Sequence, residues 1–462
     1  MNSGDTTWLL VSSALVMLMT PGLALFYGGL TRSKNVLGTI MQSFMMLGLI
    51  SVQFVIIGYS LAFGPDHGGL IGSLDWVGLR HVSASEPNAA YGPTVPHQAY
   101  MVFQLMFAVI TPALITGAFA ERAKFSTFLV FMLIWATVVY DPIAHWVWGS
   151  GGWLGIVPGA NGATHVKALD FAGGTVVHIN AGVGALVAAF LYGKRHGFGR
   201  EPMEPHDITM VVIGAALLWF GWFGFNAGSA IASVNTDAAG NAIGSIATSA
   251  FVATHVATAA AALVWVFLSW FHTGKPSVVG AAAGAVAGLV AITPASGFVS
   301  PMGGLAIGAI AGGLCYYAVR LRSRSGLDDS LDVVGVHGVG GTWGAIATGI
   351  FCSLAVNPGG ADGLLNGGGF DQLGRQVIAV VATLLYSGVL TFVILKVLDM
   401  TMGLRVSEEE EIVGLDVSQH GERGYLLDGG FGYAGIPVVT NGSNEHAGAP
   451  VQAPAATSEA IG

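Results

Sequence analysis

Long apolar segments separated by short polar loops dominate the chain. A helix needs about 20 predominantly apolar residues to cross a bilayer. By this measure the sequence predicts about eleven crossings, at roughly 7–29, 40–63, 100–120, 125–148, 172–192, 208–231, 242–271, 277–294, 299–319, 335–356 and 376–400. Because lipid offers no hydrogen-bond partners to the backbone, such segments fold as helices. The sequence therefore predicts an all-α integral membrane protein with eleven transmembrane helices.

The composition supports this class and argues against others. Charged residues make up 9% of the chain and hydrophobic residues 53%, whereas a soluble domain is about 25% charged. The net charge of -9 argues against a nucleic-acid partner. Cys315 and Cys352 both fall in apolar segments, so we interpret them as packing residues. No cofactor and no enzymatic activity are predicted.

The distribution of basic residues predicts the orientation. With the N-terminus outside, only Arg80, Lys167 and Arg375 fall in outer loops, and the other fourteen of the 17 lysines and arginines face inward. Cytoplasmic loops carry the excess of such residues. The prediction is a multi-pass protein of the cytoplasmic (inner) membrane, with its N-terminus outside and its C-terminus in the cytoplasm.

The two halves of the chain resemble each other. Leu169-Asp170 precedes His178 in the fifth predicted span, and Leu331-Asp332 precedes His337 in the tenth, five spans later. Phe26-Tyr-Gly-Gly in the first span likewise resembles Phe225-Asn-Ala-Gly in the sixth. Because five is odd, the repeats are inverted, which is a common transporter architecture. We expect a 5+5 pseudo-two-fold repeat, with halves at about 7–192 and 208–356 and an eleventh helix at 376–400.

The chain becomes polar after the last span. We predict a transmembrane domain at 1–400, a cytoplasmic tail with an acidic run at 401–428, and a disordered extension at 429–462, where Gly, Ala, Pro and Ser predominate.

His178 and His337 are the strongest functional candidates. Each lies well inside an apolar segment, beside glycines that leave room for the ring. Buried ionisable residues in a membrane normally face a cavity or one another. A hydrogen-bonded core histidine is the alternative, and a metal site is another, although two histidines make a poor cage. His255 has no partner in the repeat, and we interpret it as structural.

Aromatic residues and one acid form the second group. Phe103 and Phe107 lie one turn apart, Trp148 ends the fourth span, and Phe225 lies in the sixth. Trp148 either anchors the bundle at the interface or binds a cation on its face. Asp170 either caps helix amides or draws a cation toward the mouth, and the same two readings apply to the aspartates near the tenth span.

Four segments resemble the ammonium transporter family, the Amt/Mep/Rh group, and specifically its bacterial Amt branch. The similarity extends to about Asp428. Its most specific stretches are Asp170-Phe-Ala-Gly-Gly-Thr-Val-Val-His-Ile-Asn180, Gly221-Trp-Phe-Gly-Phe-Asn-Ala-Gly-Ser229, Gly335-Val-His-Gly-Val339 and Gly403-Leu-Arg-Val-Ser-Glu-Glu-Glu-Glu411. The resemblance implies a homotrimer in membrane lipid, each protomer with its own narrow hydrophobic pore.

The resemblance also implies roles for particular residues. Phe107, Trp148 and Ser229 match the outer ammonium site. Phe107 and Phe225 match the rings that close the pore below it, and His178 and His337 match the imidazoles that line it. Asp170 matches the buried acid near the outer site.

The function predicted from this resemblance is ammonium transport. The cation would bind outside and lose a proton, and ammonia would pass the pore with or without separate proton transfer. Residues Arg405 to Tyr425 would form a regulatory tail for a PII-type signalling protein, or a solvated charge run. The alternatives are an ammonium sensor of the same fold that signals through its tail, and a membrane enzyme built on the histidine pair.

Overall fold

Each apolar segment predicted from the sequence coincides with a helix in the computed structural model, which describes residues 1–159, 166–236 and 242–425. The α-helices are α1 (Ser3–Leu30), α2 (Val36–Gln53), α3 (Tyr59–Phe63), α4 (His97–Ile115), α5 (Phe125–Trp135), α6 (Asp141–Trp148), α7 (Asn180–Tyr192), α8 (Ile208–Gly228), α9 (Ile246–Thr273), α10 (Val278–Ile292), α11 (Pro301–Ser325), α12 (Val339–Phe351), α13 (Asp371–Thr401), α14 (Glu408–Val413) and α15 (Leu415–His420). The all-α membrane fold is therefore confirmed.

Short 3-10 and π-helical segments extend or interrupt these helices. They are η1 (Ser33–Asn35), η2 (Phe54–Gly58), η3 (Leu74–Leu79), η4 (Thr116–Ala118), η5 (Ala136–Tyr140), η6 (Gly174–Ile179), η7 (Val334–Gly338) and η8 (Leu364–Asn366). Three antiparallel pairs of short strands complete the described chain: β1 (Asp66–His67) with β2 (Ile71–Gly72), β3 (Pro87–Asn88) with β4 (Gly92–Pro96), and β5 (Asn235–Thr236) with β6 (Ala242–Gly244).

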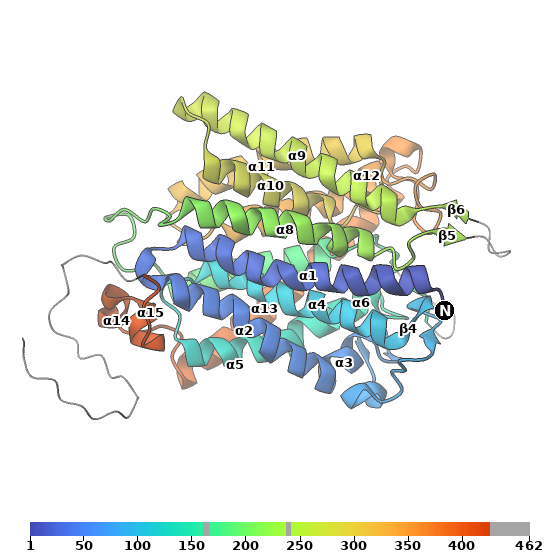
Figure 1. Ribbon diagram of the computed structural model, residues 1–462, viewed down its shortest axis with the longest axis horizontal. Helices are drawn as coiled ribbons and strands as arrows, with labels where there is room; N and C mark the ends of the chain where they lie inside the picture. Colours follow the sequence, from blue (N-terminus) through green and yellow to red (C-terminus); the bar gives the residue numbers. More distant parts are fainter. Residues whose placement is uncertain (160–165, 237–241, 426–462) are drawn as a thin grey trace, which may run out of the picture. The chain divides into compact units, whose positions relative to one another are not determined.

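The long helices run side by side along one axis (Figure 1). Within the described ranges, nine helical segments are long and apolar enough to cross a membrane. The two shorter predicted spans correspond to α10, with 15 residues, and to η7 continued by α12. The N-terminus and the labelled strands lie at one end of the bundle, and α14 and α15 lie at the other (Figure 1). The number of crossings and the side that faces outward stay predictions.

Polar residues set the beginnings of several long helices. The first backbone N–H groups of a helix have no partner within it, and a preceding Asn, Asp or Ser side chain accepts one of them. The residues that do so are Asn2 for α1, Asp207 for α8, Ser245 for α9, Ser277 for α10 and Ser300 for α11. These caps fix where each apolar helix enters the bundle.

Two helices begin with a π-helical segment that carries a histidine. His178 lies in η6, which continues into α7, and His337 lies in η7, which continues into α12. Both α7 and α12 have 13 residues. Because π-helical turns are rare and often mark functional sites, this shared local structure supports the predicted relation between the two halves.

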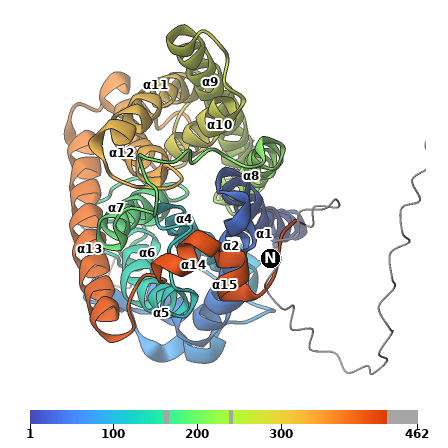
Figure 2. The same ribbon diagram turned by 90° about the vertical axis from the view of Figure 1, so that its left-hand side faces the viewer.

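The chain after α13 packs beneath the bundle as far as Gly424. Viewed from this end, α14 and α15 lie across the ends of other helices (Figure 2). Lys34 donates from Nζ to the carbonyls of Glu411 and Ile412, at 2.8 and 2.7 Å. The N–H of Gly38 donates to Asp416 Oδ1 at 2.8 Å. The extension predicted at 429–462 lies outside the described residues.

Candidate functional site

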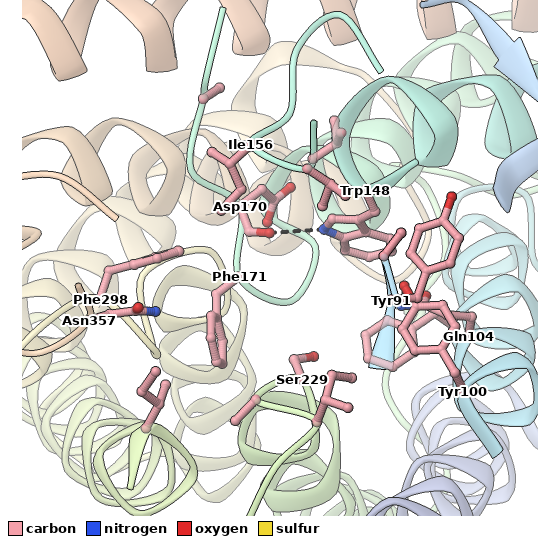
Figure 3. A pocket seen from close by; sticks show the side chains of 18 residues that line it. Tyr91, Tyr100, Gln104, Trp148, Ile156, Asp170, Phe171, Ser229, Phe298 and Asn357 are labelled. Atoms are coloured by element: carbon pink, nitrogen blue, oxygen red, sulfur yellow. Dashed lines mark hydrogen bonds between the residues drawn. The ribbon is translucent and has the colours of Figure 1, made fainter. Parts of the chain in front are cut away.

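A cavity of about 270 Å³ opens at the strand-bearing end of the bundle. Phe107, Trp148, Asp170 and Ser229 all line it, so the structure brings together side chains from four separate parts of the chain. Figure 3 shows Trp148 beside Asp170, with Ser229 across the cavity from them. Trp148 donates from Nε1 to the Asp170 carbonyl at 2.9 Å, which fixes the plane of the indole. The predicted outer site is thus a single concave surface.

The Ser229 hydroxyl is oriented by the helix that precedes it. Its Oγ lies 2.9 Å from the Phe225 carbonyl, to which it donates its only hydrogen. A hydroxyl that donates its hydrogen keeps two lone pairs free to accept. Ser229 therefore presents an acceptor to any N–H group that enters the cavity.

Two stacked phenylalanine rings lie against the cavity. The centroids of Phe107 and Phe225 are 4.2 Å apart with an interplanar angle of 29°, and each side chain is only 1% exposed. Trp148 meets Phe107 edge to face, at 5.7 Å and 89°. The rings offer no polar atom to a solute, so a hydrated ion that passes between them must lose its water.

The two histidines meet behind the stacked rings. His178 Nδ1 lies 3.3 Å from His337 Nδ1, and the ring centroids are 5.3 Å apart. The His178 ring also stacks on Phe225, at 6.2 Å between ring centroids, which connects the histidine pair to the two stacked phenylalanine rings. Both side chains are buried, and His178 Nε2 has no hydrogen-bond partner among the described residues.

This contact between the two Nδ1 atoms determines which hydrogen-bonding groups the histidine pair presents to a solute. In two neutral imidazoles that share one Nδ1–H, one ring keeps an Nε2 lone pair and the other keeps an Nε2–H. The pair then presents one acceptor and one donor. Ammonia needs both, because it donates through its hydrogens and accepts through its lone pair.

Glycines allow the two broken helices to approach closely. An added Cβ at Gly341 would lie 2.8 Å from His178 Cβ, and one at Gly182 would overlap the backbone of Gly338. Gly182 and Gly341 lie four residues after His178 and His337, respectively. The glycines noted beside the histidines in the sequence thus let the helices, and hence the imidazoles, touch.

The Asp170 carboxylate caps the backbone N–H groups around the start of η6. Its carboxylate accepts the N–H groups of Gly173, Gly174 and Thr175 at 2.6–2.7 Å, a longer one from Val176 at 3.3 Å, and the Thr175 hydroxyl. The capping interpretation is therefore confirmed. Whether the charge also draws a cation stays a proposal.

The inner counterpart of Asp170 is Asp329, whereas the sequence comparison had paired it with Asp332. Asp329 lies eight residues before His337, as Asp170 does before His178. Asp329 Oδ2 accepts the N–H of Val334, five residues later, as Asp170 accepts that of Thr175. The Leu-Asp dipeptide repeat was misleading because Asp332 lies only five residues before His337, and its carboxylate accepts from Arg322 Nε.

Sequence reasoning did not identify Gln104 and Tyr100 as cavity residues. Gln104 donates from Nε2 to the Tyr100 hydroxyl at 3.1 Å, and its Oε1 has no partner in the described part of the chain. Figure 3 places both on the same side of the cavity. A glutamine three residues before Phe107 in an apolar span was an available signal, because polar groups in lipid normally face a cavity.

A charged network lies near the tail at the opposite end. Arg195 donates to Asp328 through Nε and Nη2, at 2.8–3.2 Å, and its Nη1 lies 3.6 Å from Glu121. Burial opposes the charge of Asp328, but the hydrogen bonds from Arg195 and the guanidinium of Arg122 hold its pKa below the ordinary value. Arg405 donates from Nη1 to the Tyr192 carbonyl at 3.1 Å, and Glu411 accepts the N–H of His196 at 2.9 Å, which connects the tail to this region.

A metal site was one alternative for the histidine pair. Among the described residues, no group of three or more histidines, cysteines or acids is placed to hold an ion. His255 packs against Trp219, at 5.4 Å between ring centroids, on the α9 surface away from the histidine pair.

Comparison with known proteins agrees with this arrangement. The profile described as Ammonium Transporter Family matches residues 7–425. The chain belongs to the ammonium transporter family. An ammonium transporter of Bacillus subtilis (strain 168) is 46% identical over 426 residues, which cover 92% of this chain and 99% of the relative.

Solved structures of the family share the fold. Mep2 of Candida albicans is 36% identical, with a TM-score of 0.80, covering 92% of this chain and 90% of that one. A protein titled Sensor Amt Protein is 27% identical, with a TM-score of 0.78, covering 90% and 98%.

Proposed function

We propose that the protein transports ammonium across the cytoplasmic membrane by binding the cation in the outer cavity, removing a proton, and conducting ammonia along the histidine pair. The observation that carries this proposal is the order of groups: a polar and aromatic cavity, two stacked rings, then two imidazoles in contact. Membership of the ammonium transporter family supports the substrate.

Recruitment follows from the chemistry of the cavity. A cation is attracted to the faces of Trp148 and Phe107, and the free lone pairs of Ser229 accept one of its N–H groups. The carboxylate of Asp170 adds negative charge close by, although its amide donors neutralise much of that charge.

The selection of ammonium over potassium depends on the acidity of the ammonium ion. A charge within the bilayer costs on the order of 3 kcal/mol or more, and the rings of Phe107 and Phe225 offer it no ligands. Potassium has no proton to lose and keeps that cost, whereas ammonium can leave its proton and pass as ammonia. The site therefore discriminates between two cations of similar size.

The histidine pair supplies the polar groups of the dry segment. His178 and His337 can hold ammonia between one donor and one acceptor. Their shared Nδ1 contact also allows a proton to pass from ring to ring, since imidazole titrates readily between neutral and charged forms.

Other parts of the proposal concern the assembly. We place the N-terminus outside and the tail in the cytoplasm, in agreement with the distribution of basic residues. The functional unit is a homotrimer in membrane lipid.

The tail from Arg405 to Tyr425 is the regulatory segment for a PII-type protein, and its contacts with Lys34 and Gly38 couple it to the bundle.

A test compares two histidines that both lie in apolar helices. We expect reconstituted protein to give an ammonium-evoked current that falls strongly in His178→Ala. His255→Ala is the matched control, because His255 lies on α9 away from the pair, and it should retain the current. Equal currents in His178→Ala and His255→Ala would exclude a transport pathway along the His178–His337 pair. Ammonium binding without flux in the wild type would instead favour the sensor function carried by one structural relative.

A further inference from the structure

Three aspartates lie in the loop before η7, and two of them have arginine partners. Asp328 bonds to Arg195, and Asp332 accepts from Arg322 Nε at 2.8 Å. Asp329 has no ion pair within the described chain. It is therefore the one acid of this group that no positive side chain neutralises directly.

The carboxyl group of Asp329 is fully buried and only half satisfied. Its residue is 0% exposed, Oδ2 accepts the N–H of Val334 at 2.7 Å, and Oδ1 has no partner among the described residues. Asp170, its counterpart at the other end, accepts four N–H groups and one hydroxyl. A buried carboxylate without donors is costly. The two equivalent acids therefore differ in how well they tolerate negative charge.

The surroundings reinforce this difference. Burial, followed by the charge of nearby Asp332, raises the pKa of Asp329 to about 7, while the N–H groups of Val334 and Val333 and the guanidinium of Arg322 act in the opposite direction. Tyr27, on α1, also lies near Asp329, and its hydroxyl donates to the Leu114 carbonyl at 2.9 Å.

A small cavity brings His337 together with two neighbours of Asp329. It has a volume of about 60 Å³ and is lined by His337, Asp332 and Tyr27, among others. Tyr27 and Asp332 are also the neighbours of Asp329. Asp329 is thus a buried acid beside two of the residues that line the cavity at His337.

We propose that Asp329 is the proton-binding residue at the inner end of the pore. In this step an imidazolium of the histidine pair loses its proton and becomes neutral, the Asp329 carboxylate gains that proton, and the resulting acid releases it to the cytoplasm. The proton originates from the ammonium ion bound outside. The Asp170 carboxylate accepts four amide N–H groups and one hydroxyl, whereas Asp329 alternates between two states. This inference rests on the proposed function.

The test varies the inner pH at fixed outer pH and measures the ammonium-evoked current. In the wild type, we expect the current to change with a midpoint near pH 7. Asp329→Asn keeps an acceptor for Val334 but cannot bind the proton, so its current should fall about tenfold or more and lose that midpoint. Asp362→Asn is the matched control, because Asp362 accepts Leu354 N–H at 2.9 Å in a loop far from the histidines. A wild-type current and pH profile in Asp329→Asn would overturn the proposal.

Infrared spectroscopy tests whether Asp329 binds a proton and does not require a transport measurement. A protonated carboxyl band that titrates near pH 7 in the wild type should be missing in Asp329→Asn and present again, shifted, in Asp329→Glu. Absence of a titrating band in the folded wild type would overturn the proposal. If the wild type carried no ammonium current, the proposed function would fail, while the infrared titration would still establish whether Asp329 binds a proton.

Discussion

Replacing Gly341 by alanine should separate the two pore histidines. The new Cβ would lie 2.8 Å from His178 Cβ, whereas ordinary contacts begin at 3.4 Å, so the helices must part by at least 0.6 Å. Added to the Nδ1–Nδ1 separation of 3.3 Å, this shift gives about 3.9 Å, beyond hydrogen-bond distance. Misplacement on this scale costs up to about 100-fold in rate, and overpacking costs about 1–3 kcal/mol of stability.

The assay is the ammonium-evoked current of reconstituted protein, with thermal unfolding measured on the same preparation. Gly313→Ala is the matched control, because a Cβ at Gly313 of α11 meets nothing within 4 Å. We expect Gly341→Ala to stay folded with a greatly reduced current, and Gly313→Ala to resemble the wild type. A folded Gly341→Ala protein with wild-type current would refute the reasoning that histidine contact limits transport.

Three further predictions concern binding, stability and pH. Ser229→Ala removes a hydrogen bond to a cation, worth about 1.5–3 kcal/mol, so uptake kinetics should show KM raised about tenfold or more; an unchanged KM would contradict this role. Arg195→Gln removes the hydrogen-bonded partner of the buried Asp328 and leaves it only Arg122, at 4.0 Å, so the free energy of unfolding should fall by about 3 kcal/mol, unlike in the exposed Arg324→Gln. Asp329 has a folded pKa of about 7 against an ordinary 3.8, so the wild type should lose up to about 4 kcal/mol as pH rises from 4 to 7. Asp329→Asn should lack this loss in melting curves, and parallel curves would contradict the assignment.

Helix positions could be predicted because a membrane span has a strong compositional signal. The predicted segments at 125–148 and 208–231 correspond to helical residues Phe125–Trp148 and Ile208–Gly228. Local caps such as Asp207 refine these limits. The π-helical segments could not be predicted, because they arise where two helices adapt their backbones to each other.

Contacts between side chains were less predictable from the sequence than the positions of the helices. His178 and His337 were identified because each is a polar residue in an apolar span, but their contact depends on the crossing at Gly182 and Gly341. Asp332 was paired with Asp170 on a dipeptide match, whereas capping geometry assigns that role to Asp329. Hydrogen-bond partners across 159 residues of sequence depend on tertiary packing, which local patterns do not contain.

The most direct test of the central claim is the current across a supported membrane from wild-type protein, challenged in turn with ammonium and potassium. Selection by acidity predicts a transient for ammonium and none for potassium, because only ammonium can separate into ammonia, which passes Phe107 and Phe225, and a proton, which moves along His178 and His337. Equal transients for the two cations would contradict the account, and silence to both would contradict a charge-moving pathway through His178 and His337.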